Sequence, residues 1–190
     1  MRKVIALVFH YSVNGLVADE GTDYLRFCFD LLEEAGGASS DDESLDVLQG
    51  AHAHVMGRNA YAGMSRSLPK NPDHPWSGIL TAGRKVVFSR TLEAADWDNT
   101  IIASGDTTAE IDKLRHGGDG HIIVWGGVTL WRSLMRLDLI DEWHLGLHPY
   151  IADEGTQLFD DVPGGYRLDL ISSTALQSTG ILELQYGRHR

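Results

Sequence analysis

The chain has 190 residues, of which 43% are hydrophobic and 23% charged, a composition typical of a globular domain with a sizeable core. Its formal net charge of -11 argues against a broad phosphate-binding surface for DNA or RNA, and no apolar stretch approaches the roughly 20 residues of a membrane helix. A single cysteine excludes an internal disulfide, so we expect a cytoplasmic protein. From the length and composition we expect one domain over residues 1–190.

The first part of the chain predicts one strand and one helix. Residues 3–9 form a β-branched apolar run that lacks the cleavage site of a signal peptide, and Asn14 begins a turn. Residues 22–36 carry apolar side chains at helical spacing, with Thr22 as the N-cap. Within this helix we expect Cys28 on the buried face, as a small apolar residue.

The middle of the chain contains two segments without a regular pattern. Residues 36–44 are small, polar and acidic, which is typical of a solvated loop of uncertain order. Residues 67–84 contain three of the five prolines and are expected to be largely irregular. Between these segments the pattern predicts a short helix at 43–51, a strand at 53–57 and a helix at 58–65.

From residue 85 onward, strands and helices alternate along the chain. The pattern predicts strands at 85–89, 99–104 and 121–126, helices at 107–116 and 129–137, and after them strands at 141–151, 166–176 and 181–189 with a turn at 178–180. Alternation of this kind implies right-handed crossovers and a parallel sheet covered on both faces. We therefore expect an α/β fold with a three-layer αβα architecture. Its mixed, mostly parallel sheet ends in an antiparallel C-terminal hairpin.

Two adjacent glycines lie where the strand at 121–126 meets the next helix. Gly126 and Gly127, followed by Val128 and Thr129, allow the backbone to approach a ligand without an intervening Cβ. Ligands of open α/β sheets bind beyond the carboxyl ends of the strands, where a helix N-terminus attracts an anion, so a bound pyrophosphate is the natural candidate. A strand-to-helix turn without any ligand explains the same pair of glycines.

Two other predicted strands end in a small residue followed by arginine. Arg58 follows Gly57, and Arg90 follows Ser89. The guanidinium group forms a fixed fork that suits phosphate, and a dinucleotide with a pyrophosphate and a ribose 2'-phosphate needs such a distributed set of donors. Each arginine alone is equally compatible with a surface residue or an ion-pair partner, but three such strand ends on one rim favour phosphate binding.

These stretches together resemble a known family. The segments SVNGLVA, VMGRNAY, KVVFSRTL and HIIVWGGVTLWRSLMRLDLIDEWHLGLHPYIADEGTQLF, in this order, are similar to the dihydrofolate reductase-like superfamily, and within it to the C-terminal reductase domain of the bacterial riboflavin-biosynthesis enzyme (RibD). The resemblance implies a reductase that uses NADPH and delivers hydride to a flat heterocycle or its ring-opened relative, of the 5-amino-6-(5-phosphoribosylamino)uracil reductase type. It also implies a homodimer.

The resemblance further implies a set of cofactor-binding residues. Gly57, Arg58 and Asn59 would contact the phosphates on the adenosine side, and Ser89, Arg90 and Thr91 would contact the adenine ribose and its 2'-phosphate. The pyrophosphate and the nicotinamide side would lie against Gly126, Gly127, Val128, Thr129 and Leu130. Ala6 and the loop from Asn14 to Ala18, including Val17, would line the nicotinamide site, with Asn14 and Trp125 at the substrate pocket, although packing in the core is the favoured role of Trp125.

The sequence departs from this family in two places. Ala60 stands where relatives have threonine, so a hydroxyl contact is lost. The first helix is not preceded by the Trp/Pro loop of a true folate reductase. Asp30 takes the place of its acid in an ungapped alignment and is a weak catalytic candidate, a solvated surface position being the favoured alternative, while Asp23 is favoured by the helix dipole. Dihydrofolate reduction, a nucleotide-binding protein without turnover and a purely structural dimer therefore remain as alternatives.

Two pairs of histidines are candidate metal ligands. His52 with His54, and His144 with His148, have the even spacing that places side chains on one face of a strand. No matching acidic or cysteine cluster accompanies either pair, so no metal site is expected. The acidic pair Asp141 and Glu142 is expected to have a structural or dimer-stabilising role and not to act as a catalytic acid.

Overall fold

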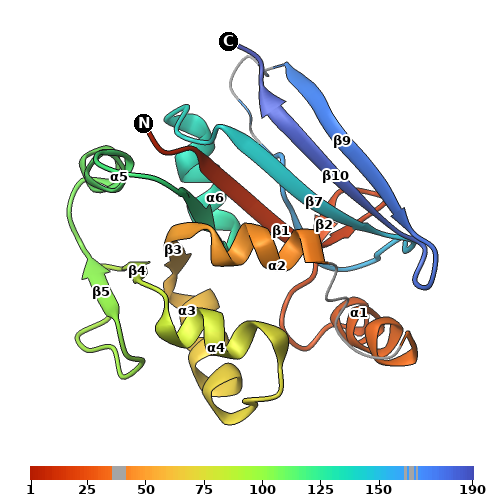
Figure 1. Cartoon of the computed structure of the whole chain (residues 1–190). Coiled ribbons are helices and arrows are strands. Elements are labelled where there is room, and N and C mark those ends of the chain that lie inside the picture. The colour runs from red at the N-terminus through yellow and green to blue at the C-terminus, as the bar shows by residue number, and fades with distance from the viewer. Residues whose placement is uncertain (36–41, 161, 163–164, 166) are drawn as a thin grey trace. The chain divides into compact units, whose positions relative to one another are not determined.

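The computed structural model describes residues 1–35, 42–160, 162, 165 and 167–190 (Figure 1). The chain divides into two compact units, the first being Met1–Ala6 with Ser40–Ile140 and the second Leu7–Ser39 with Asp141–Arg190. Strand β1 (Val4–Ser12) contributes residues to both units. Within the described part of the chain, no helix has both the length and the apolar character needed to cross a membrane.

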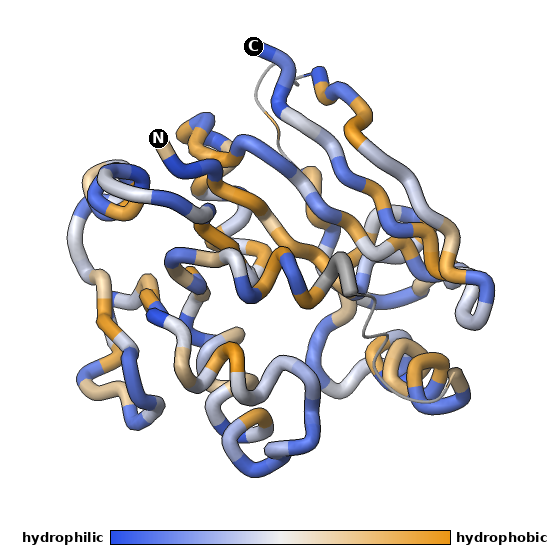
Figure 2. Tube along the Cα trace, in the orientation of Figure 1, coloured by the Kyte–Doolittle hydropathy of each residue, from blue (hydrophilic) through white to orange (hydrophobic). Residues whose placement is uncertain are grey.

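The first unit is built on parallel strands. Their order is β5 (Thr100–Ala103), β4 (Lys85–Phe88), β3 (Ala51–Gly57), β6 (His121–Val124) and then β1, and every one of these pairs is parallel. The central strands are rich in buried aliphatic residues, as strands covered on both faces require, and Figure 2 shows their apolar character. The expected strands at 53–57, 85–89, 99–104 and 121–126 are thus confirmed to within two residues at each end.

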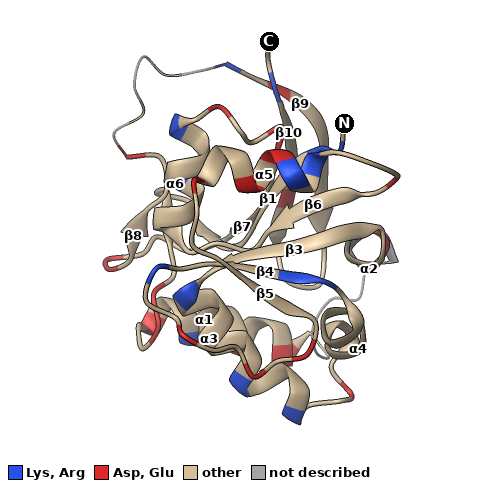
Figure 3. Ribbon diagram, turned by 90° about the vertical axis from the view of Figure 1, so that its left-hand side faces the viewer, with Lys and Arg blue, Asp and Glu red and all other residues tan. Residues whose placement is uncertain are grey.

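Helices lie on both sides of these strands. They are α2 (Asp42–Gln49), α3 (Arg58–Ser67), the 3-10 turn η1 (Leu68–Lys70), α4 (Pro75–Ala82), α5 (Thr107–Arg115) and α6 (Val128–Arg136). In Figure 3, α5 and α6 lie above β3, β4 and β5, and α3 and α4 lie below them. This layering follows from the parallel connections, which carry each helix across one face of the sheet.

The prediction that residues 67–84 are largely irregular is wrong. Pro75 begins α4, where its fixed φ suits the first helical position, and the His74 side chain accepts a hydrogen bond from the Trp76 N–H at 3.2 Å. The buried Lys85 closes the other end by donating to the carbonyls of Leu80 and Gly83 at 2.6 and 2.8 Å. These contacts come from residues outside a simple periodic pattern, so the proline content alone was misleading.

The other irregular segment is only partly described. Residues 36–41 lie outside the described residues, and residues 42–44 belong to α2 and not to the expected loop. The helix therefore starts one residue before the predicted bound of 43. Acidic residues are favoured in the first turn of a helix, which explains how a stretch that looked like a solvated loop begins one.

The second unit contains the antiparallel part of the sheet. Its strand order is β1, β7 (Glu142–His148), β10 (Ile181–Arg188) and β9 (Leu168–Leu176), and β10 is antiparallel to both of its neighbours (Figure 1). Two short strands that were not predicted, β2 (Leu16–Val17) and β8 (Thr156–Gln157), pair with each other. No helix follows residue 137 among the described residues, and the expected hairpin turn before β10 is present.

Helix α1 (Asp23–Glu34) of the second unit carries its own small core. The Thr22 hydroxyl accepts a hydrogen bond from the Leu25 N–H at 3.1 Å, which confirms the predicted N-cap. Tyr24 and Cys28 are fully buried and pack with Ala152. The predicted position of Cys28 on the buried face of this helix is therefore confirmed.

Candidate functional site

The carboxyl ends of β3, β4 and β6 form a single edge of the first unit, here called the strand-end rim. Gly57 is paired with Phe88, the residue before Ser89, and Val55 is paired with Val124. The Gly57 N–H also donates to the Gly126 carbonyl at 2.6 Å. The expectation that the three strand ends with small residues lie on one rim is therefore confirmed, whereas ligand binding at this rim stays a prediction.

Gly126 is required by its surroundings. Its φ is +100°, and a Cβ placed there would lie 2.6 Å from Cζ2 of Trp131, whose indole N–H donates to the Val124 carbonyl at 3.0 Å. Gly127 differs, because a Cβ added to it would meet nothing within 4 Å. It is the N-cap of α6, and no side chain caps the N–H groups at the start of this helix. The peptide bond between the two glycines is cis.

The second part of the strand-end rim presents arginine and hydroxyl groups. Arg58 begins α3, whose N-cap Gly57 also lacks a side-chain cap, and its Nη1 donates to Oγ1 of Thr91 at 3.0 Å. Oγ of Ser89 accepts from the N–H of Thr91 at 3.2 Å, which leaves its own hydroxyl hydrogen able to donate. Arg58, Thr91 and Arg90 are exposed. An anion at this edge would meet cationic and hydroxyl donors on an otherwise acidic protein.

The remaining residues assigned to the rim lie at the start of α3 and α6. Asn59 is exposed next to Arg58, and Thr129 is exposed in the first turn of α6. Val128 is half-buried and Leu130 is buried, so these two residues would offer a ligand their backbone groups and not their side chains. Their roles in cofactor binding stay predictions.

Trp125 lies immediately before the glycine pair but packs inward. It is buried, and its indole N–H donates to Nδ1 of His54 at 3.1 Å, while its ring centroid is 5.6 Å from that of Trp76. Burial, with smaller effects of Lys85 and His121, lowers the pKa of His54 to about 4. These contacts are those of a core residue, and the expectation that Trp125 borders a substrate pocket stays a prediction.

The residues predicted for the nicotinamide and substrate side belong to different units. Ala6, in the first unit, is fully buried and is paired with Val124. In the second unit, the Asn14 amide donates to the Ala152 carbonyl at 2.8 Å and accepts from its N–H at 3.0 Å, and Val17 is buried beside Thr156. The observed contacts of Asn14 hold its loop together, and its role toward a substrate is a prediction.

Helix α1 offers no buried carboxylate among its described residues. Asp30, the weak catalytic candidate, is exposed, and Asp23 forms an exposed ion pair with Arg26 at 2.7 Å. A catalytic acid in a folate-reductase position would need a shielded environment that shifts its pKa toward neutrality. The exposed position of Asp30 fits the alternative of a solvated surface residue.

Sequence reasoning missed one group of side chains. His10, Cys28 and His148, on β1, α1 and β7, come together within the second unit. The expectation of no metal site rested on the lack of a further ligand near the histidine pairs, and His10 and Cys28 supply such ligands beside His148. The signal in the sequence is weak because Cys28 comes 18 residues after His10 and His148 comes 120 residues after Cys28.

Comparisons with known proteins agree with this architecture. The protein is 28% identical, over 146 residues covering 74% of this chain and 76% of the relative, to the uncharacterized protein YyaP of Bacillus subtilis (strain 168). A putative riboflavin biosynthesis protein from Shewanella sp. PV-4 is similar with a TM-score of 0.75 and 22% identity, covering 99% of both chains.

Two further solved structures share the fold. A pyrimidine reductase-like protein from Corynebacterium diphtheriae has a TM-score of 0.63 and 18% identity, covering 100% of this chain and 92% of its own. Dihydrofolate reductase from Enterococcus faecalis, complexed with NADP(H) and RAB-propyl, has a TM-score of 0.61 and 14% identity, covering 99% and 97%. These likenesses confirm the predicted dihydrofolate reductase-like fold.

The family model gives the assignment its strongest support. The model of the RibD C-terminal domain matches residues 4–182, which is most of the chain and includes the whole strand-end rim. Family and fold together support a reductase-type function. The chain belongs to the RibD C-terminal domain family.

Proposed function

We propose that this protein is an NADPH-dependent reductase that transfers hydride to a small heterocyclic substrate of the 5-amino-6-(5-phosphoribosylamino)uracil type. The observation that carries the proposal is the strand-end rim, where Gly57 and Gly126 are joined by a 2.6 Å hydrogen bond and Arg58 contacts Thr91. A dinucleotide phosphate needs both accessible backbone N–H groups and charged side chains along one edge. Both kinds of donor occur at this edge.

Within the proposal, the two halves of the rim have different tasks. The uncapped starts of α3 and α6 bind phosphate oxygens through backbone N–H groups and helix dipoles, because no side chain occupies those positions. The guanidinium groups of Arg58 and Arg90, with the hydroxyls of Ser89 and Thr91, bind the 2'-phosphate that distinguishes NADPH from NADH.

The bound cofactor would supply the hydride, which carries both electrons, and the protein supplies orientation. Reduction of a C=N or C=O group also takes up one proton, which in this proposal comes from solvent, because the described carboxylates of α1 are exposed. Gly126 and Gly127 hold the nicotinamide half by letting the backbone approach closely, since neither presents a side chain to it.

The test is a titration of the purified protein with NADPH and with NADH, followed by quenching of tryptophan fluorescence. We expect Arg58→Ala and Arg90→Ala to weaken NADPH binding about 5- to 150-fold, corresponding to about 1 to 3 kcal/mol for a lost charge-assisted contact, and to change NADH binding little. Arg66→Ala is the matched control, because Arg66 is an exposed arginine near the other end of α3. Equal losses for both cofactors would contradict the assignment to the 2'-phosphate.

Turnover is tested separately from binding. Oxidation of NADPH in the presence of ribosylamino-pyrimidine precursors supports the proposal, and oxidation only with 7,8-dihydrofolate replaces it with folate reduction. Saturable NADPH binding without oxidation against either class would identify a nucleotide-binding protein without turnover. Absence of binding would show that the strand ends are turns only.

A further inference from the structure

The second unit contains a cluster of metal-ligating side chains, none of which belongs to the strand-end rim. One imidazole nitrogen of His10, one of His148 and Sγ of Cys28 all lie within 4.8 Å of one another. Cys28 is fully buried and His148 is 2% exposed. The three ligands come from three elements, β1, α1 and β7, so the group exists only in the folded unit.

The hydrogen bonding of the histidines leaves lone pairs available. Nδ1 of His148 lies 3.1 Å from the Gly146 carbonyl, and because a carbonyl only accepts, Nδ1 must carry the proton. Nε2 of His148 is then an acceptor, and it is buried without a hydrogen-bond partner among the described residues, as is Nδ1 of His10. A histidine whose ring N–H is held by a backbone carbonyl is the usual arrangement of a metal ligand.

Uncompensated nitrogens of this kind are costly in a core. A buried polar atom without a partner is destabilised relative to its hydrated state, and here one nitrogen on each of two imidazoles whose ring centroids are 5.4 Å apart is in that position. The ring centroid of Phe29 lies 5.6 Å from that of His10, and the ring centroid of the buried Tyr24 lies 6.4 Å from that of His148. A cation bound there would satisfy both nitrogens at once.

From this geometry we propose that His10, Cys28 and His148 bind a zinc ion that fastens α1 to the sheet of the second unit. Two imidazoles and one thiolate form a borderline-soft donor set that suits Zn²⁺, with the fourth tetrahedral position left to water. Zn–N bonds of about 2.0 Å and Zn–S bonds of about 2.3 Å place ligand atoms about 3.4 Å apart, so the cluster contracts by about 1.4 Å at most, within reach of side-chain rotation.

Protonation states agree with this chemistry. Burial, together with a smaller effect of His148, lowers the pKa of His10 to about 4, so this imidazole is neutral at pH 7. Burial raises the pKa of the Cys28 thiol to about 12, so the thiol is protonated without metal. Binding of Zn²⁺ forms the Zn–S bond and releases that one proton to solvent, and no electrons are transferred.

Cobalt(II) is the probe, because its ligand-field and thiolate charge-transfer bands report tetrahedral thiolate ligation directly. We expect tag-free, metal-stripped protein to bind one Co²⁺ with a thiolate band, to exchange it for Zn²⁺, and to melt at a higher temperature with Zn²⁺ bound. Cys28→Ser should abolish the thiolate band, and His148→Gln should weaken affinity on the order of 100-fold or more, because a ligand lost costs at least as much as a supporting contact.

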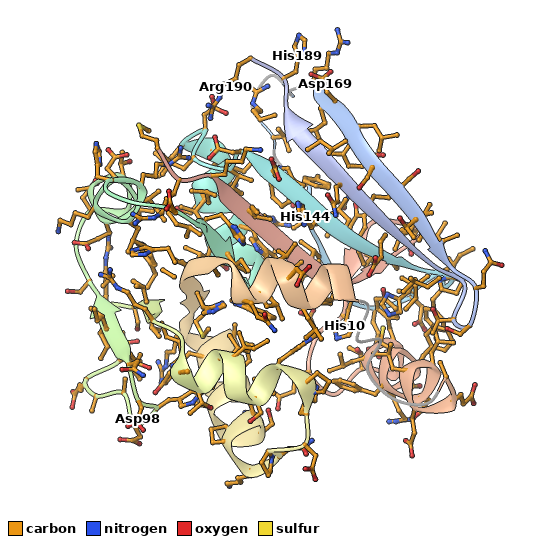
Figure 4. All side chains as sticks on the ribbon, in the orientation of Figure 1. His10, Asp98, His144, Asp169, His189 and Arg190 are labelled. Carbon is orange, nitrogen blue, oxygen red and sulfur yellow. The ribbon has the colours of Figure 1, made fainter. Side chains whose placement is uncertain are left out.

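The matched control is His144→Gln, on the same strand. His144 bonds Glu142 at 3.3 Å and lies apart from His10 in Figure 4, so this variant should keep the cobalt spectrum. Wild-type protein that shows no thiolate band with micromolar Co²⁺ and no Zn²⁺-dependent melting shift overturns the proposal, whether or not the variants fold. Binding that survives Cys28→Ser, or that His144→Gln abolishes, also overturns it. The outcome is independent of NADPH binding at the rim of the first unit.

Discussion

Acid should lower the free energy of unfolding of this protein through His54, because its buried environment disfavours the charged imidazolium. His54 is 1% exposed, and because the Trp125 indole can only donate, Nδ1 of His54 must accept the 3.1 Å hydrogen bond. Burial lowers its pKa from 6.5 to about 4, with Lys85 and His121 adding to the effect. Protonation of Nδ1 would both charge a buried ring and break the bond to Trp125.

The sign and the size of the effect follow from this difference in pKa. Between pH 6.5 and about 4 the unfolded chain binds a proton at His54 that the folded chain does not, so the free energy of unfolding falls as the pH falls. The full contribution of His54 is present above pH 6.5. About 2 kcal/mol of it is lost at pH 5, and about 3 kcal/mol below the folded pKa of about 4.

Urea unfolding at pH 7.5 and pH 5.0, followed by tryptophan fluorescence, measures this effect. The variant His54→Asn keeps an acceptor near the Nδ1 position but does not titrate, so we expect its loss of unfolding free energy over this interval to be about 2 kcal/mol smaller than that of wild type. His116→Asn, at an exposed position after α5, is the control and should behave as wild type. If His54→Asn and wild type lose equal free energy, the role assigned to His54 is refuted.

Three further predictions concern stability. Gly126→Ala should lower the free energy of unfolding, measured by chemical denaturation, by about 2 to 4 kcal/mol, because the φ of Gly126 is +100° and the new Cβ would lie 2.6 Å from Trp131. The control is Gly63→Ala in α3, where the new Cβ would have no atom within 4 Å. This variant should be neutral or more stable by up to about 1 kcal/mol. Asn14→Ala should cost about 1 to 3 kcal/mol, because it leaves the buried Ala152 backbone without its two partners, and an unchanged urea midpoint would contradict that account. Thr22→Ala should lower the melting temperature through about 1 kcal/mol of lost capping, whereas Thr22→Ser should retain most of it.

Much of the first unit could be predicted from local pattern. Buried β-branched strands alternating with helices define parallel crossovers, and small residues after three of those strands had to reach the same edge once the strands were parallel. The strand-end rim is therefore a consequence of alternation and spacing. The one large error in this unit, the segment 67–84, arose because helix α4 is closed by His74 and by the buried Lys85 and not by a periodic apolar face.

The C-terminal hairpin was equally predictable, because alternating strands flank a short turn with Gly180 at a φ of +69°. Core packing of Trp125 was expected, but its partners His54 and Trp76 were not predictable, since they are tens of residues away in the sequence. An aromatic residue next to a candidate site has the same local pattern whether it faces a ligand or the core.

The sequence by itself determined most of the strands and helices, except α4, η1 and the short strands β2 and β8, together with the parallel and antiparallel parts of the sheet and the glycine and arginine residues at the strand ends, because these depend on periodicity and on short-range backbone preferences. Only the tertiary structure decided that Gly126 must lack a side chain beside Trp131, that Asp30 is exposed, and that His10, Cys28 and His148 meet. Such contacts join residues distant along the chain, and which of them meet is fixed by how helices and strands pack, a property that no local pattern contains.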